Sequence, residues 1–184
     1  MAYRNGNYIA FDGLGELDPT KSDFKYYSTI QAWASGKGLD FKYVNSHDKT
    51  YAVRNSSLRP TLETRIRERL AASKNVVVIL SDRTRRSGSM LSYEIEKAVD
   101  RYELPLICAY TNYFKVTAPE ELSHRWPEAL EQRINNGTAK AIHIPFKKNA
   151  LLDAIGQFTV HGHTLTNGLN FYTLDAHREF GCLE

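Results

Sequence analysis

Five short apolar segments alternate along the chain with segments whose apolar residues recur at helical spacing. The predicted strands are Tyr8–Phe11, Phe41–Val44, Val76–Leu80, Leu104–Tyr110 and Ala141–Ile144. Between them, apolar positions three or four residues apart indicate amphipathic helices, as in the run Leu58, Leu62, Ile66 and Leu70. The Val76–Leu80 segment is apolar on both faces, which is typical of a strand covered by helices above and below. The pattern therefore predicts an α/β protein with a five-stranded, doubly wound parallel sheet.

The second half of the chain continues the same alternation. Thr117 and Glu120 have the spacing of a capping box, and Pro127 is expected to divide the following helix into two pieces. Apolar positions from Leu151 to Phe158 indicate a closing helix. Beyond Gly162 no pattern assigns an element. We therefore expect one α/β domain over residues 1–160 and a C-terminal extension over residues 161–184.

Composition narrows the class of protein. The 184 residues fit one medium-sized domain, and Lys plus Arg exceed Asp plus Glu by only +3, too small an excess to favour a nucleic-acid partner. No apolar run approaches the ~20 residues of a membrane helix, and the first residues lack the apolar stretch of a secretory signal. The two cysteines, Cys108 and Cys182, cannot form a disulfide framework. We expect a cytoplasmic globular protein without a membrane partner.

Several familiar motifs are missing from the sequence. Asp12-Gly13-Leu14-Gly15 resembles a phosphate-binding turn, but the third glycine of that motif would fall at Asp18. The chain contains no Walker A, HExxH or GxSxG sequence. Four potential zinc ligands occur in the tail, but their spacing matches no standard finger: His161, His163, His177 and Cys182. We therefore expect no metal ion and no bound cofactor.

In a doubly wound sheet, ligands bind beyond the carboxyl ends of the strands. The loops at those ends begin at Asp12, Asn45, Ser81 and Thr111. Asn45-Ser46-His47-Asp48 offers amide, imidazole and carboxylate groups that could hold sugar hydroxyls or move a proton. Such residues also favour ordinary polar turns, and composition alone favours that interpretation.

Glu94 is the most informative single residue. It borders the apolar stripe of its own helix and lies near the helix's amino-terminal end, which should face the ligand crevice. Partial burial would raise the pKa of this carboxyl, while the helix N-terminus would oppose that rise. The alternative is a boundary glutamate that pairs with an arginine.

Three arginines follow the third strand closely. Arg83, Arg85 and Arg86 together equal the whole positive surplus of the chain. They could attract the pyrophosphate of a dinucleotide, or they could be an exposed, solvated loop.

Three segments in this order resemble a bacterial TIR-like family that includes the TIR proteins of Thoeris anti-phage defence. They are Tyr8-Ile9-Ala10-Phe11-Asp12-Gly13, Asn45-Ser46-His47-Asp48 and Tyr93-Glu94-Ile95, and the resemblance covers roughly residues 7–158. It implies a flavodoxin-like TIR fold and an NAD nucleosidase or ADP-ribosyl cyclase that splits NAD at the nicotinamide–ribose bond. It also implies an ADP-ribose-derived signal, cyclic or linear, that activates a partner effector. A phage-derived trigger and a homo-oligomer are further expectations of the same resemblance.

The resemblance also assigns roles to residues. Glu94 matches the TIR glutamate, which contacts the ribose and supports its cationic transition state. The substrate-binding candidates are Phe11, Asp12, Asn45, His47, Asp48, Ser81, Arg83 and Tyr93. The chain departs from the family pattern at Met90, where a tryptophan is usual, and at Ala10-Phe11-Asp12, where a serine-containing motif is common.

Two other functions remain open from the sequence. The first is a non-catalytic TIR-like module that acts by self-association or partner docking. The second is a phosphoacceptor receiver domain, for which an acid, an acceptor, a hydroxyl and a lysine would stand at Asp12, Asp82, Thr111 and Lys147.

Overall fold

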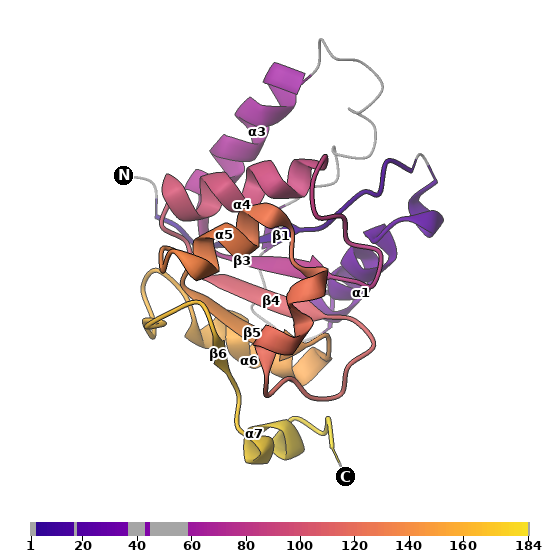
Figure 1. Ribbon diagram of the computed structural model, residues 1–184, viewed down its shortest axis with the longest axis vertical. Coiled ribbons are helices and arrows are strands. Elements are labelled where there is room, and N and C mark those ends of the chain that lie inside the picture. Colours follow the sequence, from indigo (N-terminus) through magenta and orange to yellow (C-terminus); the bar gives the residue numbers. More distant parts are fainter. Residues whose placement is uncertain (1–2, 17, 37–42, 45–58, 184) are drawn as a thin grey trace.

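A computed structural model describes residues 3–16, 18–36, 43–44 and 59–183. Within them lies one parallel sheet of six strands in the order β2-β1-β3-β4-β5-β6 (Figure 1). The strands are β1 (Gly6–Ala10), β2 (Tyr43–Val44), β3 (Ser73–Leu80), β4 (Leu106–Tyr110), β5 (Ala141–Pro145) and β6 (Asn170–Phe171). The predicted five-stranded, doubly wound α/β arrangement is confirmed, with β6 added at one edge.

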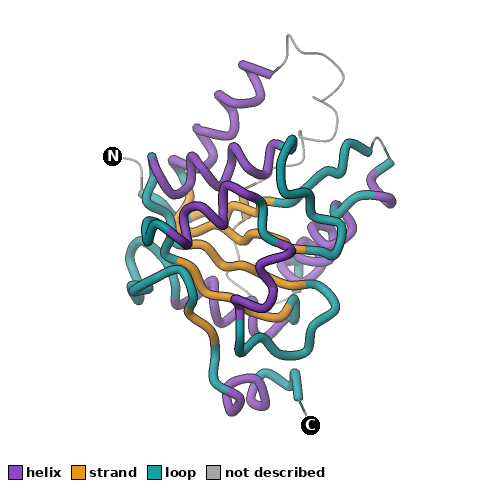
Figure 2. The backbone as a smooth tube through the Cα atoms, viewed as in Figure 1, coloured by secondary structure: helices purple, strands orange, loops and turns teal. Residues whose placement is uncertain are grey.

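Helices cover both faces of the sheet, as Figures 1 and 2 show. One face carries α3 (Arg59–Ala71), α4 (Met90–Asp100) and α5 (Glu128–Asn135), and the other carries α1 (Phe24–Ala34) and α6 (Lys148–Gln157). Alternate residues of a strand point to opposite faces, so β3 serves both cores: Val76 and Val78 pack under α3 and α4, and Val77 and Ile79 under α1. The strand order reverses between β1 and β3, which makes their carboxyl ends the expected ligand crevice.

Local details differ from the sequence-based expectations. β1 ends at Ala10, so Phe11 and Asp12 already belong to the loop that follows it. The expected capping box is wrong, because the residue before the helix is Ala118 and no side chain caps it. The first piece is instead a 3-10 helix, η3 (Pro119–Arg125), and Pro127 separates it from α5 as expected.

The C-terminal segment adds elements that the sequence pattern did not indicate. Beyond α6 the chain forms β6, which pairs in parallel with β5, and then α7 (Leu174–Glu179). Gly168 passes so close to α5 that a Cβ there would lie 3.1 Å from Ile134 Cγ1 and 3.3 Å from its Cα. A larger residue at this position would press the tail against the backbone of α5, so glycine fits the close crossing. The division at residue 160 stays a prediction.

Buried polar side chains connect β4, β5 and the tail in a series of hydrogen bonds, here called the β4–β5 relay. Trp126 Nε1 donates to Tyr110 Oη at 2.6 Å, and Tyr110 Oη lies 2.7 Å from His143 Nδ1. His143 Nε2 lies 2.7 Å from the Gly168 carbonyl oxygen. Burial lowers the pKa of His143 to about 4, so the imidazole is neutral, with Nε2–H donating to Gly168 and Nδ1 accepting from Tyr110.

Candidate functional site

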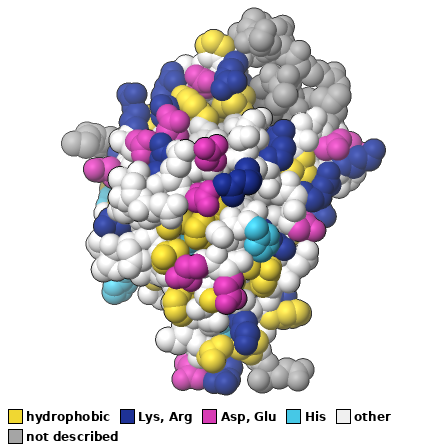
Figure 3. All heavy atoms as spheres, in the orientation of Figure 1, with side chains coloured by type: hydrophobic (Ala, Val, Ile, Leu, Met, Phe, Trp, Pro, Cys, Tyr) yellow, Lys and Arg dark blue, Asp and Glu magenta, His cyan; other side chains and the backbone are white. Residues whose placement is uncertain are grey.

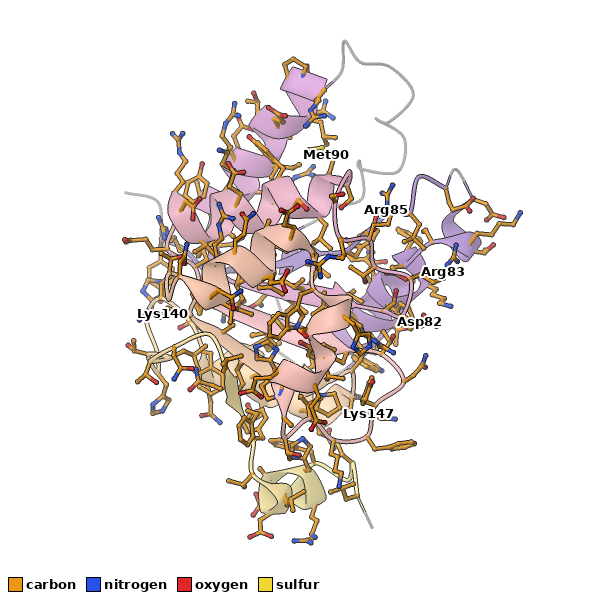
Figure 4. All side chains as sticks on the ribbon, in the orientation of Figure 1. Asp82, Arg83, Arg85, Met90, Lys140 and Lys147 are labelled. Atoms are coloured by element: carbon orange, nitrogen blue, oxygen red, sulfur yellow. The ribbon has the colours of Figure 1, made fainter. Side chains whose placement is uncertain are left out.

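The candidate site lies at the carboxyl ends of β1 and β3, where the β3–α4 loop (residues 81–89) leads into α4. Figure 4 labels Asp82, Arg83, Arg85 and Met90 in this part of the molecule. Because β1 and β3 are hydrogen-bonded neighbours, residues that follow them meet here although they lie about 70 positions apart in sequence. The sequence-based choice of these two loops therefore leads to one place in the fold.

Asp12 and Arg85 form the charged pair of this region. The Asp12 side chain is fully buried and accepts hydrogen bonds from Arg85 Nη2 at 2.7 Å and from Arg85 Nε at 3.0 Å. The backbone N–H groups of Arg85 and Leu14 also donate to it, at 3.0 and 2.8 Å. Burial would raise the pKa of Asp12, but these hydrogen bonds and the Arg85 charge hold it below its usual value. Asp12 is thus a fixed anion that keeps the β3–α4 loop against the end of β1.

Glu94 projects from the second turn of α4 into the core rather than bordering it. The residue has no exposed surface, and its Oε1 accepts a hydrogen bond from the hydroxyl of Tyr8, which lies on β1. Burial, followed by the Glu94 charge and hydrogen bond, raises the pKa of Tyr8 well above its ordinary value, so the phenol stays protonated and donates. A carboxylate without exposed surface can contact a substrate only after the packing around it opens.

Tyr93, the neighbour of Glu94, points elsewhere. Its hydroxyl accepts a hydrogen bond from Arg67 Nη1 on α3 at 2.8 Å, and Lys97 Nζ lies 5.3 Å from its ring centroid. Phe11 is also directed away from the loop, because its ring packs against Tyr27 and Phe24 beneath α1. The Tyr93 hydroxyl is therefore engaged by α3, and the Phe11 ring by α1.

Ser81 directly follows β3 and joins the β3–α4 loop to Asp23, the residue before α1. Its hydroxyl donates to Asp23 Oδ2 at 2.8 Å and accepts from the Arg83 backbone N–H at 3.2 Å. Burial raises the pKa of Asp23 to about 6, against the opposing hydrogen bond from Ser81. Asp23 was missed in the sequence because it precedes a helix and looks like a cap, although its side chain makes no cap hydrogen bond.

The arginines of the loop are engaged by protein groups. Besides the Arg85–Asp12 pair, Arg86 pairs with Glu131 on α5. Arg83 donates to the Lys21 carbonyl oxygen at 2.7 Å and lies 4.0 Å from Glu16. The Arg83–Glu16 distance is the longest of the three ion pairs, so Arg83 has the weakest one, and its side chain remains 54% exposed. On the face in Figure 3, basic and acidic side chains are interspersed, so the loop is a local feature and not part of a broad basic surface.

Asn45, His47 and Asp48 lie outside the described residues. Their assignment as substrate-binding residues therefore stays a prediction from the family resemblance.

The contacts of Asp12 and Lys147 do not fit a receiver domain. Its first acid, Asp12, is bound by Arg85, and the Lys147 ammonium lies 4.2 Å from the centroid of the Phe114 ring. A receiver site needs a free acid and a lysine that both face the acceptor carboxylate. The chain holds these groups at strand ends but uses them for other contacts.

Two further searches cover the described part of the chain. In that part, no group of three or more His, Cys, Asp or Glu side chains is placed to hold a metal ion. His177, one of the four tail residues with ligand chemistry, uses both ring nitrogens for backbone groups of Thr173 and Val116. Nor does a helix of that part have the length and apolar character needed to cross a membrane.

Comparison with known families identifies the family of the chain. The sequence model described as "Thoeris protein ThsB, TIR-like domain" matches residues 8–115. The match begins within β1, covers more than half of the 184 residues and includes Asp12, Arg85 and Glu94. The chain therefore belongs to the TIR-like domain family of the Thoeris protein ThsB, whose setting is the Thoeris defence system.

Proposed function

We propose that this protein cleaves NAD at the nicotinamide–ribose bond and produces an ADP-ribose-derived signal for a partner effector. The observation that carries the proposal is the placement of Glu94. It stands one turn beyond the amino-terminal end of α4, directly behind the β3–α4 loop, in a chain of the TIR-like family. This is the place from which a carboxylate can approach a ribose bound at the carboxyl ends of the strands.

The chemistry needs few groups. Nicotinamide is a cationic substituent of the ribose, so the C1′–N bond breaks with its electron pair going to the nitrogen, and neutral nicotinamide leaves. A positive charge then develops on the ribose, and the Glu94 carboxylate stabilises it as carboxylates do in glycoside cleavage. Water or a hydroxyl of the adenosine half attacks C1′ and releases a proton. Arg83, with its half-exposed guanidinium, would pair with the pyrophosphate.

The burial of Glu94 adds a condition. Its side chain contacts Tyr8 and has no exposed surface, so the resting structure does not present the carboxylate to a ribose. We therefore expect low activity in the isolated chain and activation by an event that opens the core beside α4. A phage-derived trigger or assembly into a homo-oligomer would supply that event.

The test is mass spectrometry of NAD incubated with the wild type and with Glu94→Gln, each with and without phage lysate. Loss of a transition-state charge partner should lower nicotinamide release by at least about 100-fold. Glu96→Gln is the matched control, because Glu96 lies on the same helix and pairs with Lys97 on the protein surface. Equal release from Glu94→Gln and the wild type would overturn the assignment.

A second function is supported by the same burial. A glutamate held by a tyrosine in the core also serves as a purely structural group, as expected of a non-catalytic TIR-like module that docks a partner. In that case the wild type would leave NAD intact under every condition, and Glu94→Gln would lower stability alone.

A further inference from the structure

A pocket of about 830 Å³ lies at the opposite end of the sheet from the candidate site. It opens at the amino-terminal ends of β4 and β5, where Pro105 and Lys140 precede the strands. Figure 4 shows Lys140 on the flank of the molecule away from Arg83 and Arg85. The volume of the pocket falls within the ~300–1,000 Å³ that is typical of small-molecule sites. The pocket is therefore separate from the Glu94 region and large enough for a small organic ligand.

Two cations of the lining are held by main-chain oxygens alone. Arg4 Nη1 donates to the Tyr102 carbonyl oxygen at 3.0 Å, and Lys140 Nζ donates to the Thr166 carbonyl oxygen at 3.2 Å. In the described part of the chain neither has a carboxylate partner. A carbonyl oxygen carries only a partial charge, and both side chains have further N–H donors. Each can therefore take an anion without breaking an ion pair.

The carboxylates of the lining do not cancel these charges. Asp100 is held by Arg133, whose Nε donates to Asp100 Oδ1 at 2.9 Å. Glu103, which is exposed, is then the one remaining carboxylate among the lining residues, compared with the two cations Arg4 and Lys140. The lining therefore has one more unpaired cation than unpaired carboxylates.

The floor of the pocket is apolar. Val99, Leu104 and Leu165 line it and are nearly completely buried. Thr138, Thr159 and Thr164 belong to the lining as well. A ligand with a short apolar body and one anionic end would satisfy both parts, since apolar walls with a few placed polar groups are the usual composition of small-molecule sites.

We propose that this pocket binds a small organic anion, a carboxylate or a phosphate ester on a short apolar body, with Arg4 and Lys140 as the anion-binding residues. The loop of residues 159–165 supplies one wall, so the beginning of the C-terminal segment belongs to the site. The proposal stands whether or not the chain cleaves NAD, because no lining residue belongs to the Glu94 region.

The experiment is a titration of the full ¹⁵N-labelled chain with phenyl phosphate, followed by amide chemical shifts. Binding should saturate below about 10 mM and shift the amides of Arg4, Thr138 and Lys140. Phenol and inorganic phosphate, each with half of the ligand's chemistry, should bind more weakly. No saturable shift would overturn the proposal. Equal binding of phenol would overturn the anion site, and equal binding of inorganic phosphate would overturn the role of the apolar floor.

Variants test the two cations directly. Arg4→Gln and Lys140→Gln should each weaken phenyl phosphate binding about tenfold, or about 1.4 kcal/mol. Lys148→Gln is the matched control, because Lys148 is an exposed cation on α6 outside the lining, and its affinity should equal the wild type. Unchanged unfolding curves show that the variants fold. Wild-type affinity in both lining variants would overturn the assignment.

Discussion

The carboxyl end of the sheet and the β4–β5 relay both bury polar side chains, but they satisfy them in different ways. In the relay every contact is between neutral groups, and Trp126, Tyr110 and His143 each have a defined donor or acceptor role. At the carboxyl end the Asp12 carboxylate depends on a half-exposed guanidinium, and Asp23 has its pKa raised by burial. The relay has one stable arrangement, whereas the carboxyl end keeps charges that a ligand can redistribute.

Buried polar residues therefore have different roles in the relay and at the carboxyl end of the sheet. A neutral, fully paired network fixes the packing of a core, because breaking any one bond leaves a buried group unpaired. A partly exposed ion pair beside a buried carboxylate is less costly to rearrange. Changes in the relay should therefore alter stability alone, and changes at the carboxyl end should alter stability, pH dependence and activity together.

The largest effect is expected from Tyr110→Phe. The change leaves Trp126 Nε1–H and His143 Nδ1 without partners in the core, each at a cost of about 1–3 kcal/mol. We expect a loss of about 3 kcal/mol in the free energy of unfolding, measured by urea denaturation. Tyr3→Phe, at a side chain that is largely exposed, should have no effect. If both variants unfold alike, the relay is not the structural element inferred here.

Arg85→Ala should have the next largest effect. The Asp12 carboxylate would stay buried without its cation, and because Arg85 is 41% exposed we expect about 2 kcal/mol rather than the full cost of a buried pair. Because the pKa of Asp12 is lower in the folded protein than in the unfolded chain, Asp12 stabilises the fold at pH values above its unfolded-state pKa. This stabilisation is lost as pH falls through the folded-state pKa, and the loss should be smaller in the variant. Arg83→Ala, at the weaker ion pair, should change the unfolding free energy by less than about 0.5 kcal/mol.

Tyr8→Phe tests the carboxyl end through activity. The variant removes the hydroxyl that holds Glu94 Oε1 in the core, so under the proposed function it should raise nicotinamide release by the isolated chain about tenfold, or about 1.4 kcal/mol. Tyr102→Phe, a change outside that region, is the control for general effects. A Tyr8→Phe variant that releases nicotinamide at the wild-type rate would mean that this hydrogen bond does not keep the carboxylate out of reach of a ribose.

The smallest expected effect is on the pH dependence of the unfolding free energy. A single titrating group changes the slope of that dependence by at most about 1.4 kcal/mol per pH unit. Asp23 has its pKa raised from 3.8 to about 6, so the native state holds the proton more tightly and stability falls as pH rises through that window. His143 has its pKa lowered from 6.5 to about 4, so its contribution is lost as pH falls.

These two slopes oppose each other in the wild type. Asp23→Asn should therefore make the unfolding free energy rise more steeply between about pH 4 and pH 6. Urea denaturation at several pH values measures the slope. The same slope in both proteins would show that Asp23 does not titrate in this window.

Much of the fold could be predicted because local patterns determine it. The apolar run at Val76–Leu80 indicated a strand buried on both faces, and that strand lies in the middle of the sheet. β6 escaped notice because its two residues, Asn170 and Phe171, have no periodicity, and their pairing with β5 depends on contacts distant in sequence.

The site was predicted less completely for the same reason. Helical spacing located Glu94 near a buried stripe. Only the packing of α4 against β1 shows that the Glu94 carboxylate lies in the core, hydrogen-bonded to Tyr8. The pairing of Arg85 with Asp12 spans 73 residues and follows from the strand order, which periodicity does not reveal.

The crossing of the tail over α5 has a consequence for the order of events during synthesis. His143 reaches the ribosome exit 25 residues before Gly168, whose carbonyl completes its hydrogen bonding. At ~5–20 residues per second, β5 waits roughly one to five seconds with its outer edge open and its histidine unpaired. An open strand edge is a template for pairing with another chain. The nascent protein thus keeps an open sheet edge beside β5 until β6 emerges.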